Sequence, residues 1–261
     1  MFDFKKVPRN DRWAGLAKRM PPTAACTLRK NKNYTFWQML KEITHFLFHA
    51  PRSIALNAKL PHAEFYDTIM LRGDEAGMAD WRSSLVEDIK GQVLEIGCGT
   101  GLMFSHYNHQ VNLMALELKP EFMNLAKSRA NTASAKIDLC LGNATMLPFS
   151  REAFEYVVCA LVLCSVSSVV QVLSEIRRVL NPGGEVRLIE HVRSTKRLSG
   201  ALMHVFNPLW LMLNNQGCNM NRRTETLLEQ NGFILKEVKS FKVFAPGLPA
   251  FPMRWIKSVL A

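Results

Sequence analysis

The sequence lacks any long apolar segment, and its cysteines lack the spacing of a metal site. The longest apolar run, from Tyr156 to Val166, is about half of the roughly 20 residues that a membrane-spanning helix needs. None of the six cysteines stands in a metal-type pair, so we expect no metal and a reducing compartment. The first thirty residues are polar and basic, so we expect no signal peptide. These absences predict a cytoplasmic chain, either free or peripheral on an intracellular membrane.

Acidic residues are scarce, and the imbalance is concentrated at one end. The 22 Asp and Glu stand against 33 Lys and Arg, a formal net charge of +11. Residues 1–60 hold 12 Lys or Arg and three acidic residues, a net charge of +9, which leaves +2 for residues 61–261. We therefore expect a basic, partly disordered arm over 1–60 and one domain over 61–261. The arm either binds an anionic partner, membrane headgroups or nucleic acid, or is a solvated tail without a partner.

One amphipathic helix is predicted within this arm. From Tyr34 to His49 apolar residues recur at steps of three and four, and Pro51 ends the pattern. The helix either covers an edge of the core or lies at a membrane interface, since aromatic residues stand beside the basic segment.

The rest of the chain alternates apolar strands with helices. Its α/β order is typical of a doubly wound sheet, whose ligands bind at the carboxyl ends of the parallel strands. The predicted strands are 92–96, 111–117, 136–141, 154–163 and 185–191. The predicted helices are 78–89, 102–107, 120–130 and 169–180, the last ending in a turn at 181–184.

A glycine turn follows the first predicted strand. Gly97, Gly99 and Gly101 stand at alternate positions, which lets a ligand approach the backbone closely. Glu95 lies inside the strand, and Glu117 ends the next one, where one carboxylate can accept both hydroxyls of a ribose. The pattern predicts a nucleotide site.

This Glu-x-Gly-x-Gly-x-Gly form resembles the class I S-adenosylmethionine-dependent methyltransferases, with a dinucleotide site as the alternative. The resemblance implies a Rossmann-like, seven-stranded methyltransferase sheet with an N-terminal helical extension, and S-adenosylmethionine as the methyl donor. The glycine turn would lie against the donor's amino-acid part and Glu117 would hold the ribose. The implied cofactor-binding residues are Glu95, Gly97, Cys98, Gly99, Gly101, Glu117, Leu118, Asn143, Ala144, Leu161 and Tyr66.

Two of these positions need comment. Residues 142–149 look like the family's Gly-Asp-Ala-x-x-Leu-Pro-Phe motif beside the adenine, but Asn143 replaces the acid. Its amide oxygen can still accept from the adenine amine, so we expect donor binding to survive, more weakly. Tyr66 lies in a Tyr-Asp element that closes over the donor in many members, and it is either a lid residue or a packing residue.

A narrower resemblance covers residues 91–233. Segments 156–166, 177–184, 189–192, 207–210 and 217–219 look like the methyltransferase-like seven group, small membrane-associated enzymes regarded as thiol S-methyltransferases. The resemblance stops at the start of the chain, because that group has an apolar anchor there and this chain has the basic arm.

The candidate catalytic residues follow the last two parallel strands. Methyl transfer is an in-line displacement that needs alignment and exclusion of water more than a base. We expect Cys164, Glu190 and His191 to face the acceptor. His191 either deprotonates the acceptor or is structural, and Cys164 is expected to be a small core residue rather than a nucleophile. A loop with Cys218 is a candidate lining of the acceptor pocket.

The nature of the acceptor is suggested by apolarity. Residues 198–213 hold more apolar side chains than one helix face needs, so the segment is either a buried cap or a surface among lipids. We therefore expect a monomer that methylates a small lipophilic thiol, phenol, quinone or lipid amine, with a possible membrane contact through residues 1–60. The alternatives are a nucleic-acid methyltransferase, although the Asn-Pro-Pro-Tyr tetrad is absent after residue 163, and a non-catalytic scaffold that binds the donor.

Overall fold

The computed structural model describes residues 62–214, 216–243 and 251–261, so the basic arm and its predicted helix lie outside the described residues. The strands are β1 (Gly91–Ile96), β2 (Val111–Glu117), β3 (Lys136–Leu141), β4 (Phe154–Ala160), β5 (Leu180–His191), β6 (Phe233–Val243) and β7 (Phe251–Leu260). The helical elements are α3 (His62–Gly73), the π-helical turn η2 (Asp74–Met78), α4 (Ala79–Val86), the 3-10 turn η3 (Phe104–His106), α5 (Pro120–Ala130), α6 (Val169–Val179), α7 (Arg197–Leu213) and α8 (Thr224–Gln230).

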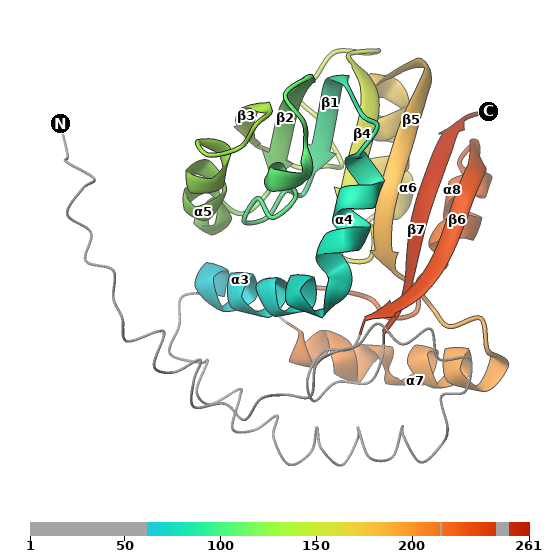
Figure 1. The fold of residues 1–261 in the computed structure, drawn as a ribbon. Helices are drawn as coiled ribbons and strands as arrows, with labels where there is room; N and C mark the ends of the chain where they lie inside the picture. Colours follow the sequence, from blue (N-terminus) through green and yellow to red (C-terminus); the bar gives the residue numbers. More distant parts are fainter. Residues whose placement is uncertain (1–61, 215, 244–250) are drawn as a thin grey trace, which may run out of the picture.

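The seven strands form one sheet in the order β3-β2-β1-β4-β5-β7-β6 (Figure 1). The first five are parallel, whereas β7 pairs antiparallel with both β5 and β6. The chain order reverses between β1 and β4, which is where doubly wound sheets bind ligands. The predicted fold class and sheet are confirmed.

Each face of the sheet is covered by a hydrophobic core. One core holds the apolar stripe of α6 with Leu228 of α8, and the other joins α4, η3 and Ala126 of α5 to the opposite face. The stripe of α6 is regular because its buried residues recur at steps of three and four. The inner strands are buried on both sides, as their nearly continuous apolar sequences predict.

Three element boundaries differ from the prediction. The helix expected at 102–107 is only a set of turns with the short η3, in which Met103, Phe104 and Tyr107 are buried. The turn expected at 181–184 is a bulge inside β5, where Phe154 pairs with Leu180 but Tyr156 already pairs with Glu185.

The third difference is at the end of β4, which stops at Ala160 rather than at residue 163. Leu161 has a positive φ of 64°, a conformation that a β-strand does not allow, so the chain turns away from the sheet there.

Helices α3 and α7 lie across the end of the sheet where the parallel strands finish (Figure 1). Among the described residues, no helix has both the length and the apolarity that crossing a bilayer would take.

Candidate functional site

The backbone N–H groups of Gly97, Cys98 and Gly101 in the glycine turn are already hydrogen-bonded, so the turn offers a ligand open space and not these donors. Gly97 and Cys98 donate their N–H groups to the Leu116 carbonyl at 2.7 and 3.0 Å, and Gly101 donates to Cys98. A Cβ on Gly97 would come within 2.7 Å of Val162, so only glycine fits there. Among the described residues, the only group within 4 Å of the position of a Cβ on Gly99 is the ring of Tyr66, at 3.7 Å. The open side of the turn therefore faces Tyr66.

Glu117 connects the tip of β2 to this turn. One of its oxygens, Oε2, accepts from the Gly99 N–H at 2.8 Å, and the other accepts from Leu118 and Lys119 at 2.9 and 2.8 Å. Three backbone donors thus fix the orientation of a buried carboxylate. Oε2 makes only one of these bonds, so it keeps the capacity to accept from a ligand hydroxyl.

Glu95 and Arg82 place a carboxyl group and a guanidinium in one pocket beside the turn. Burial raises the pKa of Glu95 to about 8, and its Oε2 has no hydrogen-bond partner among the described residues. Arg82 of α4 is 4% exposed and donates from Nε to Asp74 at 2.9 Å. Both line the pocket together with Tyr66 and the glycine turn. The pair suits a ligand that carries an ammonium and a carboxylate on adjacent atoms, as an amino acid does.

The sequence did not indicate Arg82 as a site residue. It stands in a weakly amphipathic helix 13 positions before Glu95, and only the folding of α4 onto the sheet brings it to the pocket. A lone arginine on a helix is normally solvated, so its position alone did not predict burial. The signal that could have indicated a buried Arg82 is its acidic partner Asp74, two helical turns earlier.

Tyr66 closes the pocket. Its ring packs against Phe122 of α5 with the centroids 5.1 Å apart, and burial raises the pKa of its hydroxyl to about 12. The free space is about 20 Å³, room for about one water molecule, whereas sites for drug-sized ligands measure roughly 300–1,000 Å³. A ligand of nucleoside size therefore requires Tyr66 and α3 to move.

Helix α3 is held in this position by an ion pair. Both oxygens of Asp67 accept from the guanidinium of Arg129 on α5, at 2.8 Å each. Arg129 also donates to the Thr100 carbonyl in the glycine turn at 2.7 Å. One side chain thus ties the helix over the pocket to the turn beneath it.

The residues expected beside an adenine lie at the ends of β3 and β4. The Gly142 N–H donates to the Glu117 carbonyl at 2.8 Å, which brings the 142–149 loop next to Glu117. Asn143 is exposed, but its Oδ1 already accepts from the N–H and the hydroxyl of Thr145 at 3.0 and 2.9 Å. In this arrangement the amide nitrogen, rather than the expected oxygen, is left for a ligand. Ala144 is partly buried in the same loop, Leu161 has its positive φ after β4, and Leu118 is 58% exposed.

Glu190 lies at the end of β5 and holds the loop after β4. Its carboxylate is fully buried and accepts from the N–H groups of Val162, Leu163 and Cys164 at 2.9, 2.8 and 3.0 Å. Burial raises the pKa of Glu190 well above that of an ordinary carboxyl, and the three N–H donors oppose that rise. Because both oxygens are engaged with the backbone, the geometry makes Glu190 a positioning residue.

His191 and two cysteines meet beside this loop. Nδ1 of His191 is 3.3 Å from Sγ of Cys218, while its Nε2 is buried with no partner among the described residues. Burial lowers the pKa of His191 to about 4, so the ring is neutral at physiological pH and can accept a proton. Cys164 is 1% exposed, as expected of a core residue. No group of His, Cys, Asp and Glu in the described part of the chain is arranged to hold a metal ion.

Known proteins match this arrangement in sequence and in fold. A protein-family model described as "Methyltransferase domain" matches residues 94–188. Thiol S-methyltransferase TMT1B of Rattus norvegicus is 34% identical over 160 residues, 58% of this chain and 65% of that protein. Demethylmenaquinone methyltransferase of Deinococcus radiodurans is 26% identical over 153 residues, 56% and 62% of the two chains. This chain therefore spans less than two thirds of the length of either relative.

A solved structure of a Bacillus halodurans protein has the same fold. Its TM-score is 0.56 at 16% identity, and the likeness covers 70% of this chain and 98% of that one. The matched segment holds the glycine turn, Glu117 and the strands whose order reverses at the site. Residues 94–188 are thus similar in sequence to known methyltransferase domains, and the sheet has the fold of this solved structure.

Proposed function

We propose that the protein transfers the methyl group of S-adenosylmethionine to a small lipophilic acceptor, a thiol, a phenol or quinone, or a lipid amine, at a membrane surface. The names of its relatives support the class of acceptor, since one acts on thiols and another on demethylmenaquinone. The observation that carries the membrane part is the exposed apolar face of α7.

The residues of the pocket fit the donor. The partnerless Oε2 of Glu95 and the guanidinium of Arg82 complement the ammonium and the carboxylate of its amino-acid part. Glu117 holds the ribose, for which its Oε2 has a free acceptor site. When bound, the donor supplies an electrophilic methyl group on a sulfonium. Tyr66 and α3 exclude water from it, which keeps the in-line arrangement of donor and acceptor.

His191 takes the proton of the acceptor. Its ring is neutral and its Nε2 has no partner in the described structure, so a thiol or phenol hydrogen-bonded to Nε2 would lose its proton as the new bond forms. Glu190 fixes the backbone of residues 162–164 beside it and does not contact the acceptor.

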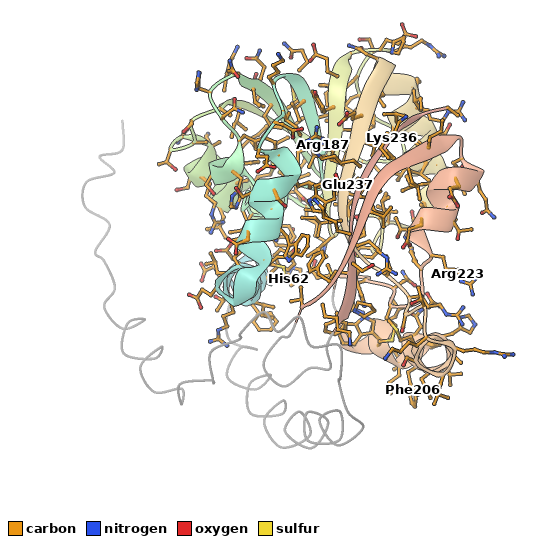
Figure 2. All side chains as sticks on the ribbon, turned by 45° about the vertical axis from the view of Figure 1, so that its right-hand side comes forward. His62, Arg187, Phe206, Arg223, Lys236 and Glu237 are labelled. Atoms are coloured by element: carbon orange, nitrogen blue, oxygen red, sulfur yellow. The ribbon has the colours of Figure 1, made fainter. Side chains whose placement is uncertain are left out.

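Helix α7 presents its apolar side chains outwards. Its inner side is formed by residues at steps of three and four, with buried Asn207 bonded to Asn219 and Met220. Figure 2 shows Phe206 on the side of α7 that points away from the sheet. The exposed apolar residues of α7 are Leu198 (76%), Leu202 (45%), Val205 (70%), Phe206 (53%), Leu209 (53%), Leu211 (37%) and Met212 (81%). Such a contiguous patch marks a contact with a membrane or a partner.

The charges around α7 favour a membrane over an apolar protein partner. Residues 192–224 contain five Lys or Arg and no Asp or Glu. Lys196 and Arg197 are exposed at the start of α7. Exposed Arg223 lies near the same end, because the Arg193 N–H donates to the carbonyl of neighbouring Arg222 at 2.8 Å (Figure 2). An apolar helix face flanked by basic residues is the pattern of an interfacial helix on anionic lipids. We propose the basic arm, residues 1–60, as a second contact with the headgroups.

The test measures vesicle binding and methylation together. Full-length protein is mixed with phosphatidylcholine vesicles, with or without phosphatidylserine, a labelled donor, and apolar and polar thiols, phenols and amines. Changing Val205 and Phe206 to Ser should weaken flotation at least about tenfold, since each buried apolar side chain contributes roughly 1.5–3 kcal/mol. Methylation of apolar acceptors should fall with it, and methylation of polar ones should not.

Two controls make the result specific. Ile234→Ser with Val238→Ser changes two exposed apolar residues of β6 and should leave flotation unchanged. Changing Arg29, Lys30 and Lys32 to Gln tests the arm and should make binding less dependent on phosphatidylserine. Equal flotation of the α7 variant and the unchanged protein would refute the membrane contact, and an acceptor panel without turnover would refute the reaction.

A further inference from the structure

The thiols of Cys164 and Cys218 meet at the edge of the acceptor side. Cys164 follows β4, and Cys218 lies 54 positions later in the loop after α7. The Asn219 N–H donates to the Cys164 carbonyl at 2.8 Å, which sets Cys218 beside Cys164, and each thiol shifts the pKa of the other. Both are free thiols in this structure. Methyl transfer uses no second thiol, so the proposed reaction does not account for this contact.

The backbone around the two cysteines is firmly held. The Asn219 N–H donates to the Cys164 carbonyl at 2.8 Å, and the Asn219 side chain donates to the same carbonyl at 3.2 Å. Asn214 accepts from the Cys218 N–H and donates to the Cys218 carbonyl, at 2.8 and 3.1 Å. These bonds keep the two segments adjacent, which is the arrangement that a bond of about 2.05 Å between the two sulfurs requires.

The two thiols are unequal in the way that a redox pair requires. Cys218 is partly exposed, and the neighbouring Cys164 thiol lowers the pKa of its thiol. Cys164 is buried, and the neighbouring Cys218 thiol together with burial raises the pKa of its own thiol. Nδ1 of neutral His191 is 3.3 Å from the Cys218 sulfur, and in the tautomer that keeps Nε2 as an acceptor its N–H donates to this sulfur, which favours the thiolate. A more acidic, accessible thiol next to a resolving thiol is typical of redox-sensing cysteines.

We propose that Cys164 and Cys218 form a reversible disulfide that switches the acceptor site off. A low-molecular-weight disulfide such as glutathione disulfide is the oxidant. The Cys218 thiolate attacks one of its sulfurs, forms a mixed disulfide and releases one thiolate. Cys164 then gives up its proton and attacks the Cys218 sulfur, which releases the second thiol. Two protein thiols are oxidised and one glutathione disulfide is reduced to two glutathiones.

Disulfide formation would act through His191. It removes the thiol that now contacts Nδ1, and it ties the 216–219 loop to the end of β4. The donor pocket lies at β1 and β2 and does not involve either cysteine. Oxidation should therefore reduce turnover while leaving donor binding unchanged, and a dithiol should restore turnover.

The experiment maps disulfides and does not depend on methyl transfer. Full-length protein is equilibrated in glutathione buffers from fully reduced to fully oxidised, free thiols are alkylated, and peptides are identified by mass spectrometry. A peptide pair linking Cys164 to Cys218 is expected, reversed by a dithiol. Cys164→Ser should leave Cys218 as a stable glutathione adduct. Cys140→Ser, a change of a half-buried cysteine outside the cluster, should leave the link intact.

The outcomes separate this proposal from the proposed function. If both thiols remain free in fully oxidised buffer, if Cys218 in the unchanged protein stays glutathionylated, or if another pair forms, the redox pair is refuted. The link alone supports it even when no acceptor is methylated. Thermal unfolding of each variant shows that it is folded.

Discussion

At the scale of single residues, burial decides what each group at the site can do. Glu95 and His191 are both buried with one partnerless polar atom, and burial moves their pKa values in opposite directions, to about 8 and about 4. Burial therefore makes the uncharged form of each group more populated at neutral pH than it is for the same group in water. Glu190 is as deeply buried, but three backbone N–H groups occupy its oxygens. Glu95 thus keeps a polar atom that a ligand can use, whereas Glu190 holds a loop.

The low pKa of His191 predicts a pH-dependent contribution to stability. In the unfolded chain the ring takes up a proton at its ordinary pKa of 6.5, but in the folded protein only near pH 4. Its contribution is therefore complete above pH 6.5 and is lost as the pH falls through about 4, a total of roughly 3 kcal/mol. His191→Phe keeps the ring contact with Phe251 and removes this dependence.

Urea unfolding of both proteins between pH 7 and pH 4 measures the effect. The variant should lose less stability than the unchanged protein over this range, and His109→Phe, at an exposed histidine, should behave like the unchanged protein. Parallel curves for His191→Phe and the unchanged protein would contradict the assignment.

At the scale of elements, two helices across the carboxyl end of the sheet have different tasks. Helix α3 faces inwards and fills the donor pocket with Tyr66. Helix α7 is anchored by a polar residue, Asn207, and turns its apolar side to solvent. An ordinary surface helix has the reverse arrangement, because apolar side chains pack inwards.

The ion pair of α3 predicts how donor exchange is controlled. Asp67→Asn removes the negative charge and one of the two oxygens that accept from the Arg129 guanidinium, which weakens this charge-assisted bonding by roughly 1.5–3 kcal/mol. Residues 62–73 should then exchange amide hydrogens faster, and the donor should dissociate at least about tenfold faster.

Hydrogen exchange with mass spectrometry and stopped-flow dissociation provide the two measurements. Glu64→Gln, at an exposed position of the same helix, is the matched control and should change neither. An unchanged dissociation rate in Asp67→Asn would show that α3 does not close over the donor.

At the scale of the whole molecule, the donor site draws on both halves of the fold. The glycine turn follows β1, Glu117 ends β2, and Arg82 comes from the helix that packs on the opposite part of the sheet at β5. Buried Arg187 of β5 completes this link, because it bonds to Asp88 and to the Leu85 carbonyl at the end of α4. A ligand at the site should therefore stabilise the domain as one cooperative unit.

Thermal unfolding with donor tests this. At a donor concentration 100 times the Kd the gain is about 2.7 kcal/mol, which raises the Tm of a domain of this size by roughly 5–10 °C. Glu117→Ala should abolish most of the shift, and Glu229→Gln on α8 should preserve it. If excess donor does not raise the Tm of the unchanged protein, the assignment of the donor site is wrong.

The sequence by itself determined the features that depend on neighbours along the chain. Apolar periodicity gave the strands β1 to β3 and the helices α5 and α6 nearly to the residue, and the spacing from Glu95 to Gly101 indicated the donor turn. These signals are local, because the periodicity of a strand or helix and the residues of a turn lie within about ten consecutive positions. Even there, the helix predicted over 102–107 was wrong, because the chain forms turns with only a short 3-10 segment.

Only the tertiary structure decided what depends on distant segments. It brought Arg82 to Glu95, and Cys218 to Cys164 and His191. It also showed that many apolar side chains of residues 198–213 are exposed and do not form a buried cap, whereas their contact with lipids stays a prediction. The physical reason is that a side chain's exposure and pKa depend on what packs against it, which chain spacing does not specify.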